Sequence, residues 1–159
     1  MMHTVHLYTD GAAKGNPGPG GYGVVLELVG TPYRKEFYEG FRLTTNNRME
    51  LLAVIVGLEK LKQPMTKVLV VSDSKYVIDS VVKNWVFGWE KKGFAGKKNP
   101  DLWKRFLKIY RQHQVDFKWV KGHNNHPQNE RCDQLAVMGS QLANLNIDAF
   151  YEREEGKML

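Results

Sequence analysis

Four acidic side chains occupy positions from which they could share one site. Asp10 and Asp73 each come directly after a segment with the pattern of a β-strand. Glu50 lies in the first turn of a predicted helix, and Asp133 lies two turns into another. In sheets covered by helices, functional side chains collect where strands end and helices begin. If the two strands are neighbours, their carboxylates are expected to emerge at the same edge of the sheet.

A cluster of these carboxylates would suit divalent metal ions. Carboxylates gathered at one point repel each other and raise one another's pKa unless a cation lies between them. Mg²⁺ and Mn²⁺ prefer oxygen ligands, whereas one cysteine and five scattered histidines are a poor basis for a zinc site. Two such ions, about 3.5–4 Å apart, can activate water and stabilise the leaving oxygen of a phosphodiester.

Each acid also has a structural explanation when it is taken alone. Asp10 could cap a turn, and Glu50 could favour the positive end of its helix. Asp73 could cap the helix that follows it, and Asp133 could pair with Arg131 or with a lysine. The metal-site interpretation therefore depends on the four acids occurring together.

The elements that must position the acids can be predicted from periodicity and capping residues. Three alternating segments predict an antiparallel meander, and a later β-branched run predicts a strand buried on both faces. The predicted strands are 4–9, 23–29, 33–42, 67–72 and 115–120, with 11–23 as a turn, and the predicted helices are 48–62, 74–83, 100–113 and 127–144. This order predicts an α/β fold with a mixed five-stranded sheet, three antiparallel strands followed by parallel additions, flanked by helices. Residues 1–146 form the predicted single domain, and 147–159 form a charged C-terminal tail.

The net charge of +6 is concentrated in one segment of the chain. Residues 83–111 contain nine of the 23 basic residues but only two of the 17 acidic ones. A local basic patch is typical of a protein with a polyanionic partner. The alternative is a solvated lysine face that maintains solubility.

Composition also indicates the cellular compartment. No apolar run reaches the roughly 20 residues that a membrane span requires, and the N-terminus lacks the layout of a signal peptide. The single cysteine, Cys132, cannot form an internal disulfide, which agrees with a reducing environment. We expect a cytoplasmic protein without membrane association.

Four longer motifs carry a resemblance to a known family. They are TDGAAKGNPGPGGYG, TTNNRMELLA, VVSDSKYV and WVKGHNNHPQNERCDQLA. Together, and in this order, they resemble bacterial ribonuclease HI from about Thr4 to Asn144. The resemblance implies the ribonuclease H fold, a monomer, and sequence-independent hydrolysis of the RNA strand of RNA–DNA hybrids that leaves 5′-phosphate and 3′-hydroxyl ends.

The same resemblance assigns roles to the acids and to one histidine. It implies that Asp10, Glu50, Asp73 and Asp133 are catalytic and bind two Mg²⁺ ions, with Mn²⁺ as an alternative. His123, in the motif GHNNH, is implied to assist proton transfer and product departure, which suits a side chain that titrates near neutral pH.

Further residues are implied to bind the hybrid. The resemblance places Asn16 near the substrate backbone, Thr45 at a DNA phosphate and Asn46 in the minor groove, where 2′-hydroxyls distinguish RNA from DNA. It places Trp85 at the DNA groove, within a basic handle at about 84–100. Lys75 lies near the RNA strand and departs from the glutamine of many relatives. Asn124-Asn125 likewise replaces the small residues that commonly follow the histidine.

Two alternatives belong to other functional classes. A hybrid-binding module without catalysis would have no evident need for four mutually repelling acids. A DNA-cutting or strand-transfer enzyme on the same fold would share those acids, but the basic handle and the TTNNRME segment favour the ribonuclease.

The loop GNPGPGG lacks the GK[ST] ending of a nucleotide-binding P-loop.

Overall fold

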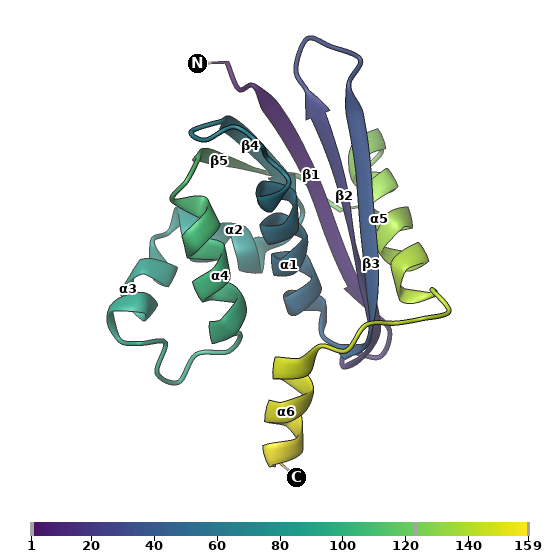
Figure 1. The fold of residues 1–159 in the computed structure, drawn as a ribbon, viewed down its shortest axis with the longest axis vertical. Helices are drawn as coiled ribbons and strands as arrows, with labels where there is room; N and C mark the ends of the chain where they lie inside the picture. The colour runs from purple at the N-terminus through teal and green to yellow at the C-terminus, as the bar shows by residue number, and fades with distance from the viewer. Residues whose placement is uncertain (1, 123, 159) are drawn as a thin grey trace.

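The computed structural model describes residues 2–122 and 124–158, with side chains described up to residue 154. A five-stranded sheet in the order β3-β2-β1-β4-β5 forms its centre, and helices cover both faces (Figure 1). The strands are β1 (Val5–Ala13), β2 (Gly18–Leu28), β3 (Arg34–Thr44), β4 (Lys67–Ser72) and β5 (Gln114–Trp119). The helices are α1 (Asn46–Glu59), α2 (Lys75–Val82), α3 (Trp85–Lys91), α4 (Pro100–Tyr110), α5 (Pro127–Ser140) and α6 (Ala149–Met158). The mixed α/β sheet is the one that the sequence predicts.

Strand β1 lies in the middle of the sheet, antiparallel to β2 and parallel to β4. Its side chains alternate between two apolar layers, because successive residues of a strand point to opposite faces. Leu7 belongs to the larger core, together with residues of α1 and α4. Tyr8 belongs to a smaller cluster with Cys132 and Leu135 of α5. Both faces of the central strands are therefore buried, as expected for the β-branched run of β4.

The first two strands are longer than the sequence predicts. The segment predicted as a turn contributes Gly11–Ala13 to β1 and Gly18–Gly23 to β2. Asp10 consequently lies within β1, opposite Gly23, rather than at the end of the strand. The turn itself is present at residues 14–17, but its predicted extent is wrong. Glycine is normally depleted in strands, whereas here a helix packs directly on the glycine backbone.

The four predicted helices begin and end within four residues of their predicted positions. Helix α1 begins two residues earlier, so Glu50 is its fifth residue and lies just beyond the first turn. Helix α5 ends at Ser140, earlier than predicted, and the helices α3 and α6 have no counterpart in the prediction. Within the described ranges, no helix combines the length and apolar character needed to cross a membrane.

Helix α5 lies unusually close to the sheet because glycines line its path. A Cβ atom at Gly23 would lie 2.7 Å from the Cβ of Leu135 and 2.9 Å from the backbone nitrogen of Ala136. A Cβ at Gly40 would overlap the carbonyl group of Gly139. Since protein interiors are close-packed, a side chain at either position would push α5, and Asp133 with it, away from the sheet.

The C-terminal segment returns to the sheet before it forms α6. Asn146 makes a parallel bridge with Phe41 on the outer edge of β3, and Asp148 is buried. Helix α6 then lies beyond the end of the sheet at which β1 finishes (Figure 1). Part of the segment predicted as a charged tail is thus in contact with the rest of the fold.

The glycine contacts predict an asymmetric response to two Gly→Ala substitutions. Gly23→Ala should destabilise the protein by about 1–3 kcal/mol, because the added methyl group meets α5 backbone. Gly88→Ala, in helix α3 with open space around the position, should be neutral or stabilising by up to about 1 kcal/mol. Urea denaturation of both variants measures the difference. A Gly23→Ala variant as stable as the parent would show that α5 does not depend on this close approach.

Candidate functional site

The parallel pairing of β1 with β4 brings two of the predicted acids to one edge of the sheet. The last pair in this register is Tyr8 with Val71. Asp10 and Asp73 follow two residues later on the two segments, just beyond the last pair of this register. The arrangement matches the one expected if these two strands are neighbours.

Gly11 brings the third acid to the same place. Its amide donates a hydrogen bond to Oδ1 of Asp10 at 3.0 Å and another to Oε1 of Glu50. A Cβ at position 11 would overlap the backbone of Met49 and Glu50, so only glycine allows α1 to approach β1 this closely. Sequence reasoning did not identify Gly11, although a glycine directly after a strand aspartate was the available signal.

Oxygen atoms of Asp10, Glu50 and Asp73 all lie within 4.8 Å of one another. Among the described residues this is the only group of three or more acids, histidines or cysteines with such spacing. The acids border a cavity of about 410 Å³, which Asp133 also lines from α5. The structure therefore brings all four predicted acids to one cavity, three of them in close contact.

Burial and repulsion between like charges dominate the electrostatics of the cluster. Burial raises the pKa of Asp10 to about 7, and the charges of Asp73 and Asp133 act in the same direction, whereas hydrogen bonds from Glu50 and Gly11 oppose the rise. Burial and the charge of Asp10 raise the pKa of Glu50 well above its ordinary value. Metal ligands that are all carboxylate oxygens, and that repel one another, suit a hard divalent cation such as Mg²⁺ or Mn²⁺.

Asp73 is fixed by its neighbours on β5 and on the loop after it. The indole nitrogen of Trp119 donates to the backbone carbonyl of Asp73 at 3.1 Å. A Cβ at Gly122 would lie 2.8 Å from Oδ2 of Asp73, so the loop backbone passes directly beside this carboxylate. Gly122 is a second residue that sequence reasoning missed. His123, the predicted proton-transfer residue, lies outside the described residues.

Three predicted substrate-binding residues are linked at the start of α1. Thr45 caps the helix, because its hydroxyl accepts a hydrogen bond from the Arg48 amide at 3.2 Å. The Asn16 side chain accepts from the Asn46 amide at 2.9 Å, and the Asn46 side chain accepts from the Ala13 amide at 2.5 Å. These bonds tie the β1–β2 turn to α1. Asn46 also lines the cavity of the acids.

The remaining two predicted substrate residues lie in different surroundings. Lys75 lines the cavity of the acids, and its ammonium group lies 4.9 Å from the ring centroid of Trp119. Trp85 lies on α3, away from that cavity, and is 48% exposed. Trp89 and Trp103 pack against each other with ring centroids 6.0 Å apart, and Trp103 is fully buried. Of these three tryptophans, Trp89 and Trp103 are packed together and Trp85 is left exposed.

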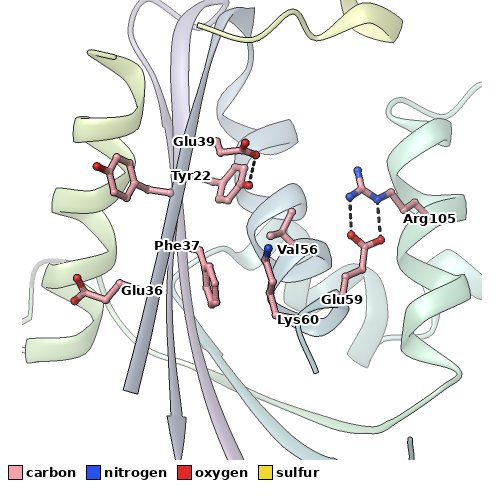
Figure 2. A pocket seen from close by; sticks show the side chains of 9 residues that line it. Tyr22, Glu36, Phe37, Glu39, Val56, Glu59, Lys60 and Arg105 are labelled. Atoms are coloured by element: carbon pink, nitrogen blue, oxygen red, sulfur yellow. Dashed lines mark hydrogen bonds and ion pairs between the residues drawn. The ribbon is translucent and has the colours of Figure 1, made fainter. Parts of the chain in front are cut away.

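A second cavity, of about 500 Å³, lies between β3, α1 and α4 (Figure 2). Among the described residues, none lines both this cavity and the acid site. Its acids already have partners. The Tyr22 hydroxyl donates to Glu39 at 2.6 Å, and Arg105 makes a two-pronged ion pair with Glu59 at 2.6 and 2.8 Å. Because Glu59 is ion-paired and Glu39 accepts a hydrogen bond from a hydroxyl, these acids do not form a group of mutually repelling carboxylates like the one in the first cavity.

The fold and the acid site together define a class of metal-dependent nucleases. The family model described as RNase H matches residues 2–141. The chain belongs to the RNase H family, as the four sequence motifs predicted.

Individual relatives agree with this assignment. Ribonuclease H of Shewanella sp. (strain ANA-3) is 50% identical over 158 residues, which cover 96% of this chain and 98% of the relative. The solved structure of LC9-RNase H1, described as a type 1 RNase H with the type 2 active-site motif, has a TM-score of 0.77 at 31% identity, covering 88% of this chain and 74% of that one. LC11-RNase H1, solved in complex with an RNA/DNA hybrid, has a TM-score of 0.62 at 27% identity over 84% of this chain and 94% of that one.

The raised pKa of Asp10 predicts how metal-free stability depends on pH. An acid that holds its proton more tightly in the folded than in the unfolded state costs stability as pH rises from its ordinary value of 3.8 toward about 7. The parent should therefore lose stability over this window, and Asp10→Asn should lose less and be the more stable protein at pH 8, by about 1 kcal/mol or more. Urea denaturation in EDTA measures both curves.

Magnesium provides the control for this comparison. Saturating Mg²⁺ should raise the unfolding midpoint of the parent, because a ligand that binds only the folded state stabilises it. The same addition should leave Asp10→Asn nearly unchanged. Parallel pH curves for the two metal-free proteins would contradict the description of the site as a cluster of repelling acids.

Proposed function

We propose that this chain is an endonuclease that hydrolyses the RNA strand of RNA–DNA hybrids, leaving 5′-phosphate and 3′-hydroxyl ends. The observation that carries the proposal is the group formed by Asp10, Glu50 and Asp73, with oxygens within 4.8 Å of one another on a ribonuclease H fold. A relative of the same fold was solved with an RNA/DNA hybrid, which supports the substrate class. A binding module without catalysis would gain nothing from holding three acids in this contact.

The four acids are the proposed ligands of two Mg²⁺ ions, with Mn²⁺ as an alternative. When bound, such ions lower the pKa of the attacking water and neutralise charge at the scissile phosphate. Gly11 holds Asp10 and Glu50 in place through its amide, and Trp119 fixes the backbone at Asp73. Asp133 completes the cavity from the side of α5.

Other residues of this chain orient the substrate and move protons. His123 is proposed to assist proton transfer and product departure. Asn46 lies at the border of the acid cavity, where it would read the minor groove and its 2′-hydroxyls. Lys75 borders the same cavity and would contact phosphates of the RNA strand. Asn16 and Thr45 are proposed to hold the substrate backbone beside it.

The basic handle is proposed to provide most of the sequence-independent affinity. It extends over about 84–100 and places Trp85 at the DNA groove. Contacts between lysines and phosphates carry no sequence information and weaken steeply as salt rises.

The buried, unpaired thiol of Cys132 supports the cytoplasm as the proposed location, and a monomer is the proposed oligomeric state.

A matched pair of aspartate substitutions tests the proposed function. Asp10→Asn should reduce cleavage of a labelled hybrid by about a thousandfold or more, because it removes a charged metal ligand while preserving shape. Asp116→Asn, at an exposed position on β5 where the aspartate pairs with His3, should cleave like the parent. Gel analysis of the RNA strand measures both rates. Undiminished cleavage by Asp10→Asn would remove the acid cluster from the mechanism.

A further inference from the structure

The chain after α5 is anchored to the fold at two points before α6 begins. The Asn146 amide donates to the Gly40 carbonyl and the Asn146 carbonyl accepts from the Arg42 amide, both at 2.9 Å. Two residues later, the buried Asp148 accepts a hydrogen bond from the Thr44 hydroxyl at 2.8 Å. These contacts fix where α6 starts.

Arg48 connects this anchor to the start of two other helices. Its guanidinium donates to both carboxylate oxygens of Asp148, at 2.7 and 2.8 Å, and to both of Asp101, at 2.9 and 2.7 Å. Arg48 is itself in the first turn of α1, and Asp101 is in the first turn of α4, directly after the basic handle. Burial alone would lower the pKa of Arg48, but its two carboxylate partners raise it above the ordinary value, so the group stays charged. One buried cation thereby fixes α1, α4 and α6 relative to one another.

This arrangement places two aromatic rings of α6 beside the proposed substrate surface. The ring centroids of Phe150 and Tyr151 lie 5.6 and 5.9 Å from the guanidinium carbon of Arg48. Both rings line a cavity of about 520 Å³ between α6 and the handle. The cavity is also lined by Asn16, Thr45, Asn47, Lys97 and Lys98. We call this cavity the α6 groove.

The α6 groove adjoins the acid site and has a wall suited to a polyanion. Asn47 lines both cavities, so the two are adjacent. Lys97 and Lys98 provide adjacent positive charges on the handle side, and Glu154 is the one acid among the described side chains that line the groove. The RNA strand must occupy the acid site, because it is the strand that is cleaved. The adjoining α6 groove is therefore positioned for the DNA strand, which lies across the minor groove of the hybrid.

We propose that α6 is part of the substrate-binding surface, with Phe150 and Tyr151 forming an apolar wall for the deoxyribose face of the DNA strand. Lys97 and Lys98 face the phosphates of that strand from the handle. A deoxyribose lacks the 2′-hydroxyl, so it presents an apolar face that an aromatic ring can cover, whereas a ribose would place a polar group there. This inference rests on the proposed function and adds α6 to it as a determinant of strand specificity.

Binding of a labelled hybrid to the Asp10→Asn protein tests the role of the rings without cleavage. Phe150→Ala/Tyr151→Ala should raise the Kd by about fivefold through lost apolar contact and leave the salt dependence unchanged. Lys97→Ala/Lys98→Ala should instead flatten the plot of log Kd against log salt by about two counterions. Tyr33→Ala, which removes an exposed aromatic ring on the β2–β3 turn, is the matched control and should bind like the parent. An unchanged Kd for the folded Phe150→Ala/Tyr151→Ala protein would overturn the proposal.

A second pair of variants and a second duplex keep the test decisive. If the alanine variant unfolds at lower urea than the parent, Phe150→Leu/Tyr151→Leu retains apolar volume but removes the flat rings, and it should still weaken hybrid binding. With wild-type Asp10, either variant should raise KM more than it lowers kcat, which a general loss of structure would not do.

Binding of duplex RNA should be insensitive to the ring substitutions. An equal loss for duplex RNA and hybrid would overturn the assignment of the groove to the DNA strand.

The two proposals fail in different ways. If the Asp10→Asn protein does not bind hybrid at all, the proposed function itself is wrong. If it binds hybrid and the ring variants bind equally well, the acid site stands and only the role of α6 is lost.

Discussion

The repulsion among Asp10, Glu50 and Asp73 is the constraint on which the rest of the structure depends. Carboxylates within 4.8 Å of one another, in a partly buried cavity, are unfavourable without a cation, so the fold must hold them there at a cost. Parallel pairing of β1 with β4 fixes two of them, and the absence of a side chain at Gly11 lets α1 deliver the third. The glycines beneath α5 position Asp133 in the same way, because they allow that helix to approach the sheet closely. The positions of the acids are thus determined by how closely the backbones of α1 and α5 approach the sheet.

Substrate binding, in the account proposed above, is distributed over segments that are far apart in the sequence. Asn16 on the β1–β2 turn and Asn46 at the start of α1 are joined by a hydrogen bond. Arg48 then joins α1 to the handle side through Asp101 and to the C-terminal segment through Asp148. A buried cation with two carboxylate partners is costly to break, since loss of one partner leaves an uncompensated charge. The same guanidinium therefore sets the spacing between the acid site and the walls that surround it.

Much of this could be predicted from the sequence, because the relevant signals are local. The alternating and β-branched segments predicted the five strands, and their order along the chain predicted the mixed sheet. The positions of Asp10 and Asp73 after strand-like segments predicted that they would meet. The extent of β1 and β2 could not be predicted, because it depends on the close packing of α5, which makes glycine favourable in a strand. The role of Asp148 was likewise hidden, since its partner Arg48 lies 100 residues away and neither residue has a local pattern that points to the other.

The most direct test of the central claim is cleavage of an end-labelled RNA–DNA hybrid beside duplex RNA and duplex DNA, with Mg²⁺ and with EDTA. The account predicts cutting of the RNA strand of the hybrid alone, abolished by EDTA. Binding of the hybrid without cutting, in Mg²⁺ and Mn²⁺ alike, would contradict it, because the acids would then hold no working metal. Cutting of duplex DNA would also contradict it, because the enzyme would then be a DNA-cutting enzyme on the same fold.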